Sequence, residues 1–330
     1  MLQLENRSPF AVAVAAFPDE QGIDTLVVAV KATYKAYPRF VLADVQRPVE
    51  LRDRYSGDPT QTGLVAASEV TLQKQGTDVL MVGDARTHRE YPAPYSAVSL
   101  SVAERKMTIG VFGDRYWESL GRISAPRPFV RMPLVWERAF GGTVPERGRD
   151  GMRASSLNPV GVGLRNRVGD PLPNLEDPRA PITGHGDTPD PVCFAPVAPG
   201  WLPRREHAGT YDAEWVRKRS PYLPNDFSRR FFNAGPGPFA FDRFLLGGEP
   251  VEAIGVSPQG GMRFTLPHCQ LLLHARVAGS WEMMLPLLHT VTLHPDSDEV
   301  ALTYVGTLGC DRRLLAIENV SIDQRAEAAA

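Results

Sequence analysis

Proline and glycine crowd the middle of this sequence and limit what it can form there. Between residues 141 and 240, 28 of the 100 positions are Pro or Gly, against 31 among the other 230. Proline removes a backbone donor and glycine weakens helices and strands, so regular elements must be scarce in this segment. The same segment holds nine aromatic residues, which disordered segments lack. It therefore predicts long ordered loops that aromatic side chains hold against the rest of the protein.

Short runs rich in β-branched residues lie on both sides of this segment. Such runs, separated by turn residues, are typical of strands. We expect a mainly β protein with antiparallel, sandwich-like sheets, a C-terminal meander and few short helices. The predicted strands are 11–17, 25–34, 78–82, 97–102 and 107–112, followed after the middle segment by 251–256, 262–265, 270–277, 282–285, 287–293 and 300–305.

Local signals place three turns and one helix. Residues 19–22 predict a hairpin loop in which glycine supplies a positive φ, and residues 259–261 and 278–280 predict two further hairpin turns. A short helix is expected from Asp212, as the N-cap, through Trp215 to Ser220. Pro221 ends it, because the residue before a proline disfavours helical geometry.

We interpret residues 1–330 as one domain with three parts and a tail. The N-terminal and C-terminal strand sets are expected to form sheets that the loop-rich middle joins. The tail ends in 326–330, which has nothing to bury and should fray. The parts are 1–140 (N-terminal β part), 141–240 (loop-rich part), 241–318 (C-terminal β part) and 319–330 (tail).

Charge and cysteine content argue against several classes of function. Thirty-six basic and 38 acidic residues give a formal charge of −2, which does not support an electrostatic grip on nucleic acid or on an anionic membrane. The longest apolar runs, 11–17 and 25–30, are far shorter than the roughly 20 residues of a membrane-spanning helix. Three separated cysteines and no secretory signal indicate a cytoplasmic protein with reduced thiols.

No complete catalytic or cofactor motif occurs, so we expect a protein without cofactor or metal that is not an enzyme. Two groups of residues match such motifs only in part. One is a metal patch made of His185, Asp187, Asp190 and Cys193, which lacks the fixed ligand spacing of known sites. The other is a Cys193 nucleophile with His207 as its base.

Acids beside tryptophans give a stronger enzymatic alternative. Glycosidases use paired carboxylates in clefts where aromatic rings stack sugars and raise the pKa of one acid. A carbohydrate-active hydrolase could use Asp114, Glu118 or Glu137 in this way. Asp114-Arg115 and Glu137-Arg138 each carry an adjacent cation, however, so structural ion pairs that fix loops to a sheet are the favoured interpretation of these four residues.

Four aromatic residues of the middle segment are candidates for binding another protein: Tyr211, Trp215, Phe231 and Phe232. Tyrosine and tryptophan dominate the energetic hot spots of interfaces. For Trp215, packing in the core is favoured over a place in an interface. Phe231 and Phe232 are adjacent and point differently, so both are buried only if the loop that carries them is enclosed.

Ordered strings of residues run along almost the whole chain and carry a family resemblance. The strings include Lys31-Ala32-Thr33-Tyr34, Lys74 with Thr77-Asp78-Val79, Phe112-Gly113-Asp114-Arg115, Glu137-Arg138-Ala139-Phe140-Gly141-Gly142, Gly209-Thr210-Tyr211-Asp212 with Trp215, and Phe231-Phe232-Asn233-Ala234. In these strings the chain resembles the bacterial domain-of-unknown-function family of type VI secretion effector adaptors, encoded beside PAAR and VgrG spike proteins. Three strings depart from the pattern expected at their places: Gly235-Pro236-Gly237-Pro238, His289-Thr290-Val291 and Tyr304-Val305.

The resemblance implies a cytosolic adaptor or chaperone. Such a protein holds a toxic effector, or the PAAR-containing N-terminal part of one, and helps to load it onto the VgrG spike. The resemblance carries no catalytic residue. Covering the apolar surface of an effector needs an apolar groove or an unpaired sheet edge rather than a reactive group. Two alternatives remain: the hydrolase described above, and a structural component that is exported with the spike.

Overall fold

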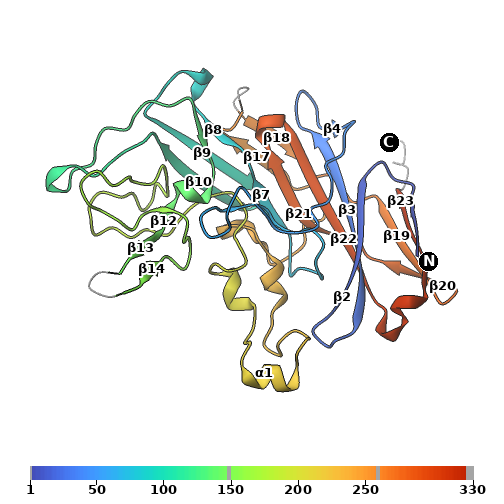
Figure 1. Ribbon diagram of the computed structural model, residues 1–330. Coiled ribbons are helices and arrows are strands. Elements are labelled where there is room, and N and C mark those ends of the chain that lie inside the picture. The colour runs from blue at the N-terminus through green and yellow to red at the C-terminus, as the bar shows by residue number, and fades with distance from the viewer. Residues whose placement is uncertain (1, 147–149, 258–260, 325–330) are drawn as a thin grey trace.

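The computed structural model describes residues 2–146, 150–257 and 261–324, and it is mainly β (Figure 1). Most neighbouring strands are antiparallel, as predicted, and three sheets of four or more strands form its body. The predicted turn at 259–261 and the fraying end at 326–330 fall wholly or partly outside the described residues.

A six-stranded sheet lies at the centre. Its strands β3, β21 and β22 are buried at nearly every position, which explains why the sequence shows continuous apolar runs there instead of alternation. Both faces of this sheet are therefore covered. In spatial order it contains β2 (Ala11–Pro18), β3 (Asp24–Lys35), β22 (Glu299–Gly309), β21 (Leu287–His294) and β7 (Asp78–Met81), with β4 (Val41–Leu42) beside β3.

Two further sheets alternate buried and exposed positions, because one face of each packs on the core. The four-stranded sheet contains β1 (Gln3–Asn6), β23 (Ile317–Gln324), β19 (Leu271–Val277) and β20 (Ser280–Met284). The five-stranded sheet contains β16 (Leu175–Glu176), β10 (Arg105–Phe112), β9 (Tyr95–Val102), β17 (Pro250–Ile254) and β18 (Gly261–Thr265).

The remaining elements are short. Four strand pairs are β5 (Arg54–Tyr55) with β6 (Leu64–Ala66), β8 (Asp84–Arg86) with β11 (Arg131–Pro133), β12 (Phe140–Gly141) with β15 (Val162–Gly163), and β13 (Thr143–Pro145) with β14 (Met152–Ala154). The short 3₁₀ helices are η1 (His88–Glu90), η2 (Ser119–Gly121), η3 (Trp136–Arg138), η4 (Arg204–His207), η5 (Arg229–Phe232), η6 (Gly237–Phe239), η7 (Pro295–Ser297) and η8 (Asp311–Ala316). The α-helix of the described residues is α1 (Ala213–Lys218).

The connectivity corrects two expectations. Each of the three large sheets combines strands from both ends of the chain, and the hairpins β17–β18, β19–β20 and β21–β22 enter three different sheets, so the C-terminal strands are not a meander. The boundary of the tail was also wrong. Residues 319–324 belong to β23, and Val320 and Ile322 are fully buried because β23 fits between β1 and β19.

Local turn chemistry was predicted correctly. In the β2–β3 hairpin Asp19 accepts from the backbone N–H groups of Gln21 and Ile23, and Gly22 has φ +80°. Ala278 and Gly279 both have positive φ between β19 and β20. The side chain of Asp212 accepts from the Trp215 N–H and caps α1.

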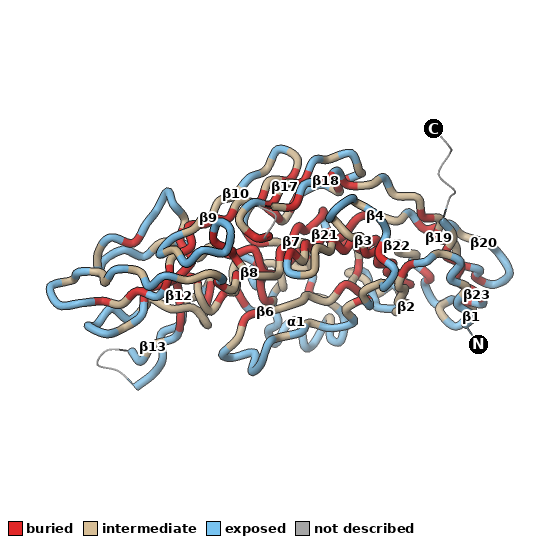
Figure 2. Tube along the Cα trace, turned by 90° about the horizontal axis from the view of Figure 1, so that it is seen from above, coloured by how far each residue is buried: buried red, intermediate tan, exposed pale blue. Residues whose placement is uncertain are grey.

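Figure 2 shows the buried residues running along the middle of the molecule between the sheets, with exposed loops at its rim. The main cluster includes side chains from all three large sheets, together with Phe194, Trp201 and Phe239 of the loop-rich segment. Three aromatic rings from loops thus lie in the core, as the aromatic content of that segment predicted.

Candidate protein-binding surface

Residues 208–228, here called the arm, project from the sheets and carry α1 at their end (Figure 1). The neck of the arm is closed by hydrogen bonds from Thr210 to the side chain of Asp226, at 2.9 Å from the backbone nitrogen and 2.7 Å from Oγ1. The same backbone hydrogen bond is the first cause of a lowered pKa of Asp226. The arm is therefore an ordered loop.

The end of the arm exposes apolar side chains. Tyr211 is 55% exposed and Val216 is 62% exposed, although a single exposed Val or Tyr would be unremarkable. Trp215 is half-buried: its ring contacts Tyr211 with centroids 4.7 Å apart, and its Nε1 donates to the Tyr222 carbonyl at 2.9 Å. The expectation that Trp215 packs in the core was wrong, because α1 does not lie on a sheet.

The β2–β3 hairpin braces the arm from the side. Arg229 donates through Nη2 to Glu20 at 2.9 Å, and this pairing lowers the pKa of Glu20. The Arg219 guanidinium bonds to the Glu20 carbonyl. Gly22 lies against the Tyr222 ring, where an added Cβ would stand 3.3 Å from it. The arm is thus held at a fixed place beside the central sheet.

Phe231 and Phe232 lie at the base of the arm rather than on its exposed end. With Phe227 they form a cluster whose ring centroids are 5.3–6.0 Å apart, a geometry that favours aromatic pairs. Both are half-buried, and Phe232 also packs against a small core cluster beside the central sheet. The structure therefore separates the four predicted aromatics into two at the end of the arm, exposed Tyr211 and half-buried Trp215, and an anchoring pair at its base.

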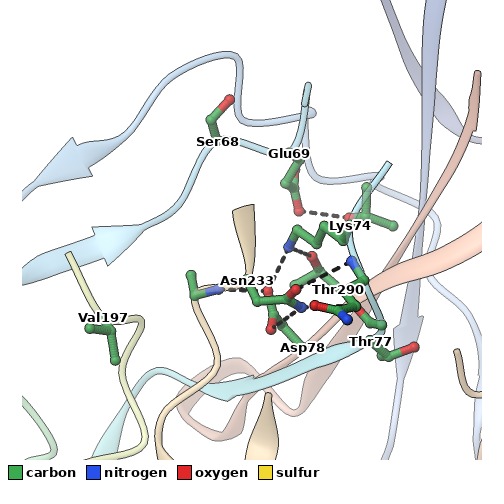
Figure 3. A network of polar contacts seen from close by, with 12 residues as sticks. Ser68, Glu69, Lys74, Thr77, Asp78, Val197, Asn233 and Thr290 are labelled. Carbon is green, nitrogen blue, oxygen red and sulfur yellow. Dashed lines mark hydrogen bonds and ion pairs between the residues drawn. The ribbon is translucent and has the colours of Figure 1, made fainter. Parts of the chain in front are cut away.

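Directly after these rings, a buried polar network attaches the loop to the central sheet (Figure 3). Asp78, at the start of β7, accepts from Lys74 Nζ at 2.7 Å, from Asn233 Nδ2 at 2.9 Å and from the Ala234 N–H at 2.8 Å. Lys74 also donates to Thr290 Oγ1 of β21 at 2.9 Å. Every member is almost completely buried, so the charges are compensated inside the protein.

A second buried pair lies nearby on β3. Lys31 Nζ donates to Glu69 Oε2 at 2.9 Å, and Thr303 Oγ1 of β22 donates to Glu69 Oε1 at 2.7 Å. The sequence did not predict a role for this pair, although Lys31, like Lys74 and Asp78, occurs in the strings that carry the resemblance. A lysine in the middle of a long apolar strand was the available signal, because a buried charge requires a partner.

Of the four residues predicted to form structural ion pairs, three do so with partners other than their neighbours in sequence, and Glu137 bonds to a backbone N–H. Arg115 bonds to Glu176 in a buried pair, and Asp114 faces Arg138 with 3.7 Å between Oδ1 and Nη1. Glu137 accepts from the Gly63 N–H at 2.9 Å. Neighbours in an extended chain point to opposite sides, so Asp114 and Arg115 do not pair with each other. Asp114 and Glu137 line one open pocket, and Glu118 is not part of its lining.

The residues of the two partial motifs do not come together. Cys193 is fully buried, and burial raises its pKa to about 12; its Sγ contacts the Leu134 carbonyl at 3.3 Å. His207 faces Glu206 instead, with 3.6 Å between Nε2 and Oε1. His185 packs edge-on against Trp117, and Asp187 accepts from the N–H groups of residues 183 and 184. Within the described ranges, no three potential ligands gather in a metal-binding group.

Comparison with known families covers most of the chain. A family model described as an uncharacterized protein conserved in bacteria (DUF2169) matches residues 21–305. The chain belongs to this family. The matched region of this DUF2169 protein includes the arm, the three buried ion pairs described above, and the central sheet except its first strand and the last residues of β22. No curated protein and no solved structure matches the chain. Among the described residues, no helix has the length and apolar character needed to cross a bilayer.

Proposed function

We propose that this protein is an adaptor that binds a type VI secretion effector, or its PAAR-containing N-terminal part, and helps to load it onto the VgrG spike. The family resemblance supports the choice of partner. The observation that carries the binding role is the arm, which presents Tyr211 and Val216 to solvent on a braced loop. Ordering such a loop in advance lowers the entropic cost of binding.

An unpaired sheet edge supports the same role. Strand β20 lies at one edge of the four-stranded sheet. Trp281 and Met283 on that strand, and Leu285 just after it, are all more than half exposed. An edge strand binds an extended peptide through main-chain hydrogen bonds, and its alternate side chains select the sequence.

The test is capture of the effector and spike proteins encoded beside this gene. Purified protein should retain one of them, and deletion of the gene should lower the level and secretion of that effector. Changing Tyr211 and Val216 to Ser should weaken capture. The matched control is Leu315→Ser, since Leu315 is fully exposed on η8. Normal effector secretion in the deletion strain would contradict the proposal.

The shared pocket of Asp114 and Glu137 favours the hydrolase as a second candidate. A hydrolase requires that Glu137→Gln abolish sugar hydrolysis while the fold survives. An adaptor has no such activity to lose, and the change then affects only the bond to Gly63. Export with the spike, the third possibility, would place this protein in culture supernatant at the level of the spike itself.

A further inference from the structure

A pocket of about 260 Å³ lies at the base of the arm. Its walls come from the loop-rich segment around η4 and η5, next to the aromatic cluster and Asn233. Its lining includes the apolar residues Trp136, Leu157, Val197 and Leu202. The polar lining residues with charged or titratable side chains are Arg204, His207, Arg230 and Asp190.

Arg204 is a buried cation that no carboxylate contacts among the described residues. It is 7% exposed, and burial lowers its pKa. Nε donates to the Phe231 carbonyl at 3.0 Å and Nη1 to the Val197 carbonyl at 2.6 Å. Nη2 has no acceptor in the described part of the chain. It is also not fully covered, unlike the unpaired Nε atoms of Arg86 and Arg115. The Phe231 ring lies over the guanidinium, 5.5 Å from its central carbon, and the Nη2 edge is left for a ligand.

Arg230 supplies a second cation on the same pocket. Its side chain is half-buried and makes no hydrogen bond or ion pair with any described residue. His207 faces Glu206, and Asp190 is an exposed acid at the rim. Two guanidinium groups therefore meet at this pocket without a carboxylate in contact with either.

A larger pocket of about 520 Å³ shows the opposite arrangement. It lies over the central sheet and is lined by Lys31, Arg47 and Arg54. Each of these cations is already paired, with Glu69, Glu299 and Glu50 in that order. The cations of the larger pocket are thus neutralised by carboxylates, whereas Arg204 and Arg230 of the smaller pocket have no carboxylate in contact among the described residues.

We propose that the Arg204 pocket binds the carboxylate of a glutamate side chain presented by the partner polypeptide, an inference that rests on the adaptor function proposed above. Nη2 of Arg204 can donate a charge-assisted hydrogen bond to a carboxylate oxygen. The guanidinium of Arg230, which has no partner among the described residues, can donate the two parallel hydrogen bonds that carboxylates accept. The apolar lining residues accommodate the two methylenes of glutamate. The volume lies below the roughly 300–1,000 Å³ of small-molecule sites, so it suits one side chain rather than a nucleotide or a cofactor.

The binding test uses acetyl-glutamate-N-methylamide as the probe and the full chain as the receptor. Titration followed by NMR should shift resonances of the pocket, whereas the glutamine analogue at equal concentration should not. Arg230→Ala should weaken binding of the probe about tenfold, which corresponds to about 1.4 kcal/mol. Arg205→Ala is the matched control, because Arg205 is exposed on η4 and does not line the pocket. Arg230 carries the test since Arg204, being buried, also supports the fold.

The outcomes separate this inference from the adaptor function. Equal shifts with both probes, or unchanged affinity in Arg230→Ala, would overturn the glutamate site. The same variants are then used to capture the adjacent-gene effector. If Arg230→Ala captures the effector as well as the wild type does, the pocket is not the docking site, but the proposed adaptor function is not contradicted. If the glutamate probe binds but no effector is captured, the adaptor function fails and the carboxylate site remains.

Discussion

Removing the charge of Asp78 should destabilise the protein strongly while preserving the shape of the side chain. In Asp78→Asn, the buried Lys74 ammonium loses its only carboxylate contact within the described structure. Breaking a buried ion pair by removing one partner costs about 3–5 kcal/mol. The unfolding entropy of about 2.1 cal/mol/K per residue gives roughly 0.7 kcal/mol/K for 330 residues. The expected fall in Tm is therefore about 4–7 °C.

Calorimetry of matched variants measures this effect. Lys218→Ala removes an exposed pair with Glu214, in which both side chains are more than 60% exposed, and it should cost less than about 1 kcal/mol. Adding Lys74→Met to Asp78→Asn should recover part of the lost stability, because the uncompensated cation is then gone. Faster amide exchange near Asn233 should accompany the single change. A Tm of Asp78→Asn within about 1 °C of the wild type would refute the reasoning.

Three further predictions concern the arm, a thiol and a histidine. Trp215→Ala should lower Tm by less than about 2 °C, since the ring is half-buried outside the core, and it should weaken effector capture. A larger fall in Tm, measured by calorimetry, would contradict this and mean that Trp215 packs in the core. Burial raises the pKa of Cys193 to about 12, so iodoacetamide at about pH 8.5 should label it only in denaturant, and mass spectrometry of native protein would reveal any exception. Burial, and then Arg47 and Lys31, lower the pKa of His294 to about 3. On acidification the unfolded chain protonates His294 first, near pH 6.5. The free energy of unfolding should therefore fall between about pH 6.5 and 3, by up to about 1.4 kcal/mol per pH unit. In urea titrations His294→Gln should make this dependence of stability on pH less steep.

Strand positions were predictable because local chemistry determines them. The apolar run of β3 predicts a strand, and Asp19 with Gly22 predicts a turn, from residues that are close together in the sequence. β23 was missed because Ile317–Gln324 mixes polar and apolar residues, and its burial depends on β1 and β19, which lie far away in sequence. Pairing between the two ends of the chain, and with it the sheet order, has no local signal.

The candidate site was predictable only in part. Tyr211 was assigned to a binding surface because of its residue type and its place beside the predicted helix. The anchoring role of Phe231 and Phe232 depends on Phe227 and on the small core cluster, which only the folded chain brings together. The two arginines of the pocket were not recognised from sequence, since an arginine without an acid partner looks the same in a sequence as one that is paired.

The buried polar groups and the loop-rich sequence have one physical explanation. Strand pairing fixes a segment with so many prolines and glycines only in part, because the segment makes few and short backbone ladders. Asp78 takes over that task by accepting from Asn233 and from the Ala234 N–H, each of which lies more than 150 residues away in the chain. Side-chain acceptors in the core thus replace backbone partners in the loops. Because a half-satisfied network costs more than an apolar core, the loop around Asn233 has one well-defined place, and this also fixes the base of the arm that precedes it.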